Sequence, residues 1–98
     1  MKIFKYSLPI KQTKKDRFFY KIPYSATFLA LQVQFDTPVM WYLIPDGVTE
    51  PHEDTRIFRI FGTGIEMSVE PEDIYLGSFQ IAAGHFVGHV FDITRGQL

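Results

Sequence analysis

Apolar and polar residues alternate with a period of two along most of the chain, which is typical of half-buried β-strands. The alternation in residues 28–35 predicts a buried face made of Leu29, Leu31, Val33 and Phe35. Residues 39–44 lie between two prolines and are apolar on both faces, so they predict a central, buried strand. Strands are expected at residues 2–8, 17–22, 28–35, 39–44, 55–61, 75–81 and 85–93.

Turn-forming residues separate these strands. Tight turns are expected at Asp36-Thr37-Pro38, at Gly62-Thr63-Gly64 and at Ala82-Ala83-Gly84. Residues 46–54 predict an exposed acidic loop, and residues 65–73 predict at most a short edge strand followed by one turn after Pro71. No window predicts an amphipathic helix. We therefore expect an all-β fold, an antiparallel β-sandwich or small barrel of roughly seven to eight strands with little helix, as one domain over residues 1–98.

Composition narrows the classes of function. The 98 residues contain no Cys, which excludes disulfides and thiolate metal sites. The net charge of −1 excludes a globally basic nucleic-acid binder. No apolar run approaches the ~20 residues of a membrane span, and no signal peptide precedes the first charged residues. These features predict a cytoplasmic protein that does not enter a membrane.

The charge is unevenly distributed. Residues 1–21 contain seven basic residues and one acid, whereas residues 22–98 contain three basic residues and ten acids. The basic stretch at residues 11–21 includes Phe18, Phe19 and Tyr20, a combination that can bind single-stranded nucleic acid. Pairing of the two oppositely charged parts, within one molecule or between copies, is the simpler interpretation. A nucleic-acid partner is therefore not expected.

His85 and His89 have the spacing that holds a metal on a helix. On a strand, residues four apart share a face but lie about 13 Å apart, which is too far for one metal ion. We therefore expect neither a metal nor another cofactor. The two histidines remain candidates for contacting a ligand, most simply where two copies of the chain meet.

Two arginines are the best candidates for binding an anion. If Phe58 and Ile60 face the core, Arg56 shares their face and lies near a sheet end, whereas Arg59 points the other way with Phe61. An arginine among aromatic residues can bind an anion or a nucleobase. The alternative is a surface ion pair with an acid of residues 46–54.

Further candidates lie on neighbouring segments. Trp41 and Tyr42 point to opposite faces of one strand, where each can fill a core or one can be a stacking surface. Gln32 and Gln34 can donate and accept hydrogen bonds on a sheet face or can be plain surface residues. Thr63, between two glycines, lies in a turn that can contact a phosphate through its backbone, although the full phosphate-loop pattern is missing. No catalytic constellation is found, so an enzyme is not expected.

Six short blocks give the chain a family resemblance. They are Met1–Tyr6 (MKIFKY), Leu31–Gln34 (LQVQ), Met40–Leu43 (MWYL), Phe61–Gly64 (FGTG), Tyr75–Gln80 (YLGSFQ) and His89–Phe91 (HVF). In this order they resemble small tailed-phage and prophage proteins that form a domain family of unknown function. The resemblance implies a phage accessory protein in the bacterial host cytoplasm, and it brings no catalytic residues.

We expect a protein that binds without catalysis. The leading hypothesis is a counter-defence protein that sequesters a small anionic ligand of the nucleotide type. The alternative is a protein-interaction module that inhibits a host protein or serves as an accessory piece of the virion. A homo-oligomer, most simply a twofold dimer, is also expected, because the aromatic content is high and the last strand carries no charge to protect an edge.

Overall fold

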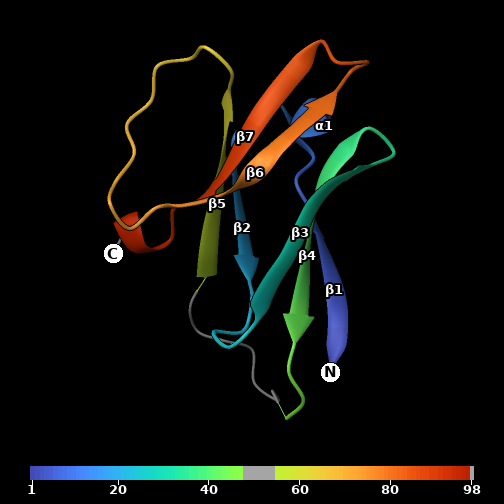
Figure 1. Ribbon diagram of the computed structural model, residues 1–98, viewed down its shortest axis with the longest axis vertical. Coiled ribbons are helices and arrows are strands. Elements are labelled where there is room, and N and C mark those ends of the chain that lie inside the picture. The colour runs from blue at the N-terminus through green and yellow to red at the C-terminus, as the bar shows by residue number, and fades with distance from the viewer. Residues whose placement is uncertain (48–54, 98) are drawn as a thin grey trace.

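The computed structural model describes residues 1–47 and 55–97 (Figure 1). These residues form seven strands, one short α-helix and a C-terminal 3₁₀ turn. In chain order they are β1 (Lys2–Ser7), α1 (Ile10–Thr13), β2 (Arg17–Lys21), β3 (Thr27–Gln34), β4 (Thr37–Ile44), β5 (Thr55–Gly62), β6 (Ile74–Ile81), β7 (Phe86–Asp92) and η1 (Arg95–Gln97).

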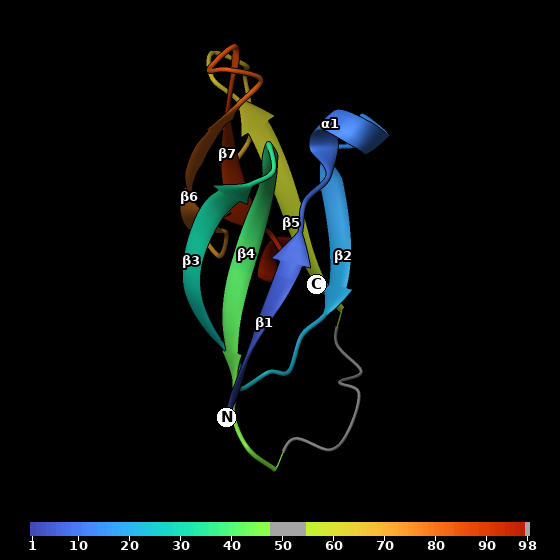
Figure 2. The ribbon, with the colours of Figure 1, turned by 90° about the vertical axis from the view of Figure 1, so that its right-hand side faces the viewer.

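The strands form two antiparallel sheets that pack face to face (Figure 2). One sheet has three strands in the order β1-β4-β3, and the other has four in the order β2-β5-β7-β6. β4 lies in the middle of its sheet, as its two apolar faces predict. The two sheets also approach each other at one side, where a Cβ on Gly77 of β6 would lie 3.4 Å from the Leu31 side chain of β3. The prediction of an all-β sandwich is confirmed.

The core is formed by the facing sides of both sheets. Tyr42 of β4 lies at its centre, with its ring in edge contact with Tyr6, Phe28 and Phe58. Burial raises the pKa of the Tyr42 hydroxyl to about 12, because the charged phenolate is poorly solvated there. The other buried apolar residues of this cluster are Leu8, Phe18, Ile22, Met40, Phe58, Ile60, Phe79, Ile81 and Val90.

The buried face of β3 differs from the predicted one. A β-bulge between Phe28 and Ala30 shifts the alternation, so Phe28 and Leu31 pack against the core and Leu29, within the bulge, is exposed. Val33 keeps the face of Leu31 but is exposed near the end of this edge strand, and Phe35 is exposed in the turn that follows. The sequence contains no glycine here to reveal the bulge. The expectation that Leu29, Val33 and Phe35 are buried with Leu31 is therefore wrong.

The hairpin between β3 and β4 turns one residue earlier than expected. Its two central residues are Phe35 and Asp36, with φ of +52° and +59°, as in a type I′ turn, and Thr37 already belongs to β4. Asp36 fixes this turn to its surroundings, since it pairs with Lys11 at 2.5 Å and accepts the backbone N–H of Ala82. These bonds, with the Lys11 bond as the larger cause, hold the pKa of Asp36 below its ordinary value.

The remaining connections show one difference from the prediction. Residues 65–73 form no strand, which agrees with the expectation of at most a short one, and Pro71 and Glu72 form the expected turn. The turn between β6 and β7 contains His85, so that β7 begins at Phe86. The predicted acidic loop at 46–54 lies outside the described residues from position 48 onward.

β7 is an interior strand between β5 and β6, so it has no free edge to protect. The edge argument for a dimer is therefore wrong, because the uncharged last strand is already paired on both sides. The argument from exposed aromatic residues remains, and the dimer stays a prediction. Light scattering behind a sizing column tests it: a mass that stays at 11.4 kDa over a wide concentration range would refute it.

Candidate functional site

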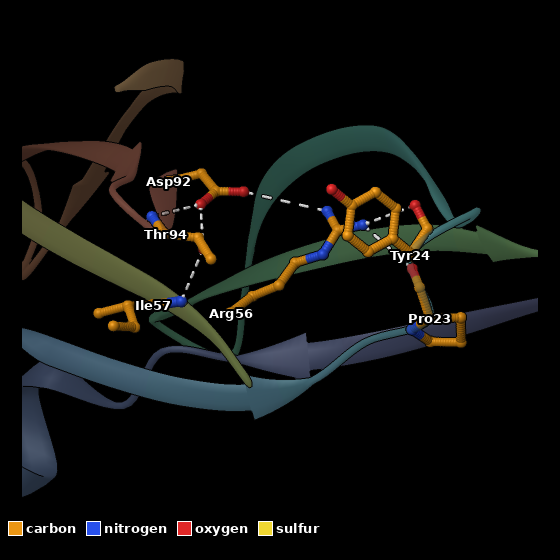
Figure 3. A network of polar contacts seen from close by, with 6 residues as sticks. All are labelled: Pro23, Tyr24, Arg56, Ile57, Asp92 and Thr94. Atoms are coloured by element: carbon orange, nitrogen blue, oxygen red, sulfur yellow. Dashed lines mark hydrogen bonds and ion pairs between the residues drawn. The ribbon is translucent and has the colours of Figure 1, made fainter. Parts of the chain in front are cut away.

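The two arginines of β5 lie on opposite faces of the strand, as the alternation predicts. Phe58 and Ile60 are buried, which places Arg56 on the inner face and Arg59 on the outer face. The guanidinium of Arg56 donates hydrogen bonds to the carbonyl oxygens of Pro23, at 3.0 Å, and Tyr24, at 3.3 Å (Figure 3). It also lies 5.4 Å from the centre of the Tyr42 ring.

Asp92 of β7 completes this network on the inner face. Its carboxylate lies 3.9 Å from Arg56 and accepts hydrogen bonds from the backbone and the hydroxyl of Thr94 (Figure 3). The Thr94 hydroxyl oxygen in turn accepts the backbone N–H of Ile57. Arg56 is thus held by groups of the protein itself, and it connects the loop after β2 to β5 and β7.

The outer face of the four-stranded sheet brings three of the predicted residues together. His89 of β7 lies at the centre, with its Nε2 2.8 Å from the Thr63 hydroxyl and its Nδ1 3.1 Å from the Tyr75 hydroxyl. Arg59 lies one strand away, with its guanidinium 4.5 Å from the centre of the Phe61 ring. Its Nε atom is 3.4 Å from the carboxylate of Asp16.

Aromatic rings connect these polar groups. Phe91 makes an edge contact with Phe61, at 5.7 Å between ring centres, and a tilted contact with Tyr75, at 5.1 Å. Tyr75 is 52% exposed, so its ring offers a surface for stacking. The strand register explains the arrangement, because Arg59 and Tyr75 both lie directly opposite Phe91. We call Arg59, Phe61, Thr63, Tyr75, His89 and Phe91 the arginine–aromatic face.

The other predicted residues lie elsewhere. Trp41 points away from the core on the outer face of the three-stranded sheet, since its neighbour Tyr42 is buried in it. Gln32 and Gln34 share that face, where Gln34 accepts a hydrogen bond from Lys5. The two predicted histidines are separated: His85 is exposed in the turn before β7. His89 lies on the arginine–aromatic face with Thr63 and Tyr75 as its hydrogen-bond partners.

Sequence reasoning missed Tyr75 and Phe91 as parts of the site. Alternation along single strands reveals which residues of one strand share a face, and it did join Arg59 to Phe61. It does not reveal that β7 lies between β5 and β6, and this order brings Phe91 and Tyr75 into one row with Arg59. The available signal was local, because Phe91 shares a face of its strand with His89, which was already a candidate.

The chemistry of the arginine–aromatic face suits binding. A guanidinium held over a ring presents its N–H donors to an anion, and the rings of Phe91 and Tyr75 can stack on a planar group. Both ring nitrogens of His89 have hydroxyl partners, so the imidazole is held in place.

Within residues 1–47 and 55–97, no group of three His, Asp or Glu side chains is placed to hold a metal ion. None of the helices in these ranges is long and apolar enough to cross a membrane.

Comparison with known protein families gives one match. Residues 1–97 match the family described as a domain of unknown function, DUF7352. The chain belongs to this family. No curated protein matches the chain, and no solved structure matches it. Family membership covers nearly the whole chain and leaves the assignment of function to the chemistry of the site.

Proposed function

We propose that this protein sequesters a small anionic ligand of the nucleotide type on the arginine–aromatic face, without catalysis. The observation that carries the proposal is Arg59, whose guanidinium lies on the ring of Phe61 and directly opposite Phe91 in the strand register. An anion-binding group beside rings that can stack matches the two parts of a nucleotide, the phosphate and the base. A phage origin and a counter-defence role in the host cytoplasm complete the proposal, and they rest on the resemblance of the sequence blocks.

His89 supports the proposal, because its ring is held between two hydroxyl groups at the centre of the face. The Thr63 hydroxyl donates to the carbonyl oxygen of Val87 at 3.3 Å, so it can act toward a ligand as an acceptor, and the Tyr75 hydroxyl can also accept a hydrogen bond. They can therefore contact the exocyclic groups of a base or the hydroxyls of a sugar. Binding without turnover is all that sequestration requires.

The test is retention of ligand. The protein is incubated with a mixture of cyclic nucleotides and ADP-ribose derivatives, washed and heat-denatured, and the supernatant is analysed by mass spectrometry. Release of an unaltered nucleotide from the wild type, with loss of retention in Arg59→Gln, supports the proposal. Gln32→Ala, on the outer face of the other sheet, is the control and should retain the ligand. A chemically altered ligand would indicate an enzyme, and no retained nucleotide would refute sequestration.

Phe35 favours a second candidate, a protein-interaction module that inhibits a host protein or serves in the virion. Its side chain is 91% exposed at the tip of the β3–β4 hairpin, and its φ is +52°. A positive φ is unfavourable for a bulky residue, and the exposed ring gains nothing from burial. Exposed aromatic residues often anchor protein interfaces. A partner captured from host lysate by the wild type, and lost with Phe35→Asn, would favour this function.

A further inference from the structure

Two arginines lie directly opposite each other on the outer face of the four-stranded sheet. In the antiparallel register Arg17 of β2 pairs with Arg59 of β5, which places their Cβ atoms about 5 Å apart. Both side chains point away from the core, since their neighbours Phe18 and Phe58 are buried. Like charges in directly opposite positions destabilise a sheet unless an anion compensates them.

The protein supplies only part of that compensation. Asp16 lies 3.4 Å from the Nε atom of Arg59, and its side chain is itself largely exposed. Arg17 is exposed and takes part in no ion pair with any residue in the ranges 1–47 and 55–97. The pair of arginines therefore retains a net positive charge at the surface, beside an aromatic row.

We propose that Arg17 and Arg59 together bind the phosphate group of the ligand, and that its base lies along the same row on Phe91 and Tyr75. This inference rests on the proposed function and adds a residue and a ligand chemistry to it. Two guanidinium groups can each bind two oxygens of one phosphate. A sulfate or phosphate between them would relieve the repulsion that the register imposes.

The register gives the bound ligand a direction. Arg17, Arg59, Phe91 and Tyr75 follow one another across β2, β5, β7 and β6, a row of about 14 Å at a strand spacing of ~4.8 Å. The segment that leads from β5 into β6 lies on the outer side of this sheet (Figure 1) and carries Glu66, Glu70, Glu72 and Asp73. These acids oppose a phosphate near β6, so the phosphate is expected beside β2.

The experiment measures binding of adenosine monophosphate, inorganic phosphate and adenosine by titration calorimetry at low ionic strength. Arg17→Gln should weaken binding of adenosine monophosphate and of phosphate at least tenfold and should leave binding of adenosine unchanged. Lys21→Gln is the matched control, because Lys21 lies on the same face of the same strand and loses the same charge. It should change each affinity less than twofold.

A second variant tests the pair in the opposite direction. Because the phosphate would compete with Asp16 for Arg59, Asp16→Asn should strengthen binding of adenosine monophosphate several-fold.

A thymidine oligonucleotide distinguishes two sources of the phosphate, a free nucleotide and the backbone of a single-stranded nucleic acid. Tighter binding than the mononucleotide, with the same dependence on Arg17, assigns the phosphate to a single-stranded backbone, and weaker or equal binding assigns it to a free nucleotide.

The possible failures can be told apart. Equal losses in Arg17→Gln and Lys21→Gln would reduce the pair to a general charge effect and overturn this inference. Loss of binding in Arg59→Gln but not in Arg17→Gln would overturn it as well, while the proposed function would stand. If the wild type binds none of the probes at millimolar concentration, this inference is refuted, and the retention test with cyclic nucleotides and ADP-ribose derivatives decides separately whether the proposed function stands.

Discussion

Arg56 and Arg59 lie three residues apart on β5, and the fold surrounds them differently. On the inner face, Arg56 has two carbonyl oxygens, one carboxylate and one aromatic ring as partners. On the outer face, Arg59 has a single exposed carboxylate at 3.4 Å, the ring of Phe61 at 4.5 Å and another arginine opposite it in the register. The contacts of Arg56 stabilise the fold, so no ligand is needed to explain why an arginine lies there. The outer face contains charge that folding does not require, and such residues are candidates for binding.

The largest effect that this comparison predicts is the loss of Arg56. Arg56→Ala would leave Asp92, which is 8% exposed, without its cation and two carbonyl oxygens without their donor. We expect a loss of about 3 kcal/mol in the free energy of unfolding, measured by urea denaturation. Arg59→Ala should cost less than about 1 kcal/mol, because its ion pair is at the surface. Equal losses at the two positions would contradict the comparison.

Gly88 provides a second contrast between the two faces, on β7. A Cβ at Gly88 would lie 2.5 Å and 2.8 Å from atoms of the Phe79 ring and 2.9 Å from the Phe86 ring, on the packed inner face. Gly88→Ala should therefore destabilise the protein by about 2 kcal/mol through overpacking. Ser78→Ala, on the outer face of β6, should change stability by less than about 0.5 kcal/mol. A neutral Gly88→Ala would show that these rings can move aside.

The tyrosine at the centre of the core predicts a pH dependence. Burial raises the pKa of Tyr42 from 10.0 to about 12, so the unfolded chain releases this proton at a lower pH than the folded one. The stabilisation that comes from keeping Tyr42 neutral is therefore complete below pH 10 and is lost between pH 10 and 12. At pH 11 the free energy of unfolding has fallen by about 1.4 kcal/mol. Burial raises the pKa of Tyr6 and Tyr20 in the same direction.

The measurement compares the free energy of unfolding of wild type and Tyr42→Phe from pH 8 to pH 11. Each protein is referred to its own value at pH 8, so that the loss of the hydroxyl itself cancels. The variant should lose less stability on the alkaline side than the wild type, by roughly the contribution of one tyrosine. Parallel curves would show that Tyr42 ionises with similar ease in the folded and unfolded chains.

Much of the fold follows from local pattern, because alternation requires only the neighbouring residues. It placed Trp41 and Tyr42 on opposite faces of β4, and it placed Arg56 and Arg59 on opposite faces of β5. It failed at β3, where the bulge after Phe28 is set by pairing with β4 and by no residue type in the segment. The helix α1 also escaped prediction, since four residues are too short for a periodic pattern.

The candidate site depends on strand order, which single-strand patterns do not contain. Arg17 and Arg59 are 42 positions apart, and Tyr75 reaches the same row only because β7 separates β5 from β6. Thr63 and His89 were each identified from their own segments, but their hydrogen bond follows from the pairing of β5 with β7. Residue types were therefore predictable and their assembly was not.

The smallest predicted effect concerns Phe35, at the tip of the β3–β4 hairpin. Like Arg59 on the outer face, it is a residue that folding does not require. Asn tolerates positive φ better than Phe and is favoured in type I′ turns. Phe35→Asn should therefore raise the free energy of unfolding by about 0.5 kcal/mol, measured as a higher urea midpoint. Phe19→Asn is the matched control, because Phe19 is also exposed but lies within β2 without a positive φ. It should give no gain. A loss of stability in Phe35→Asn would show that the ring contributes to folding, and it would remove the argument that Phe35 is kept for a partner.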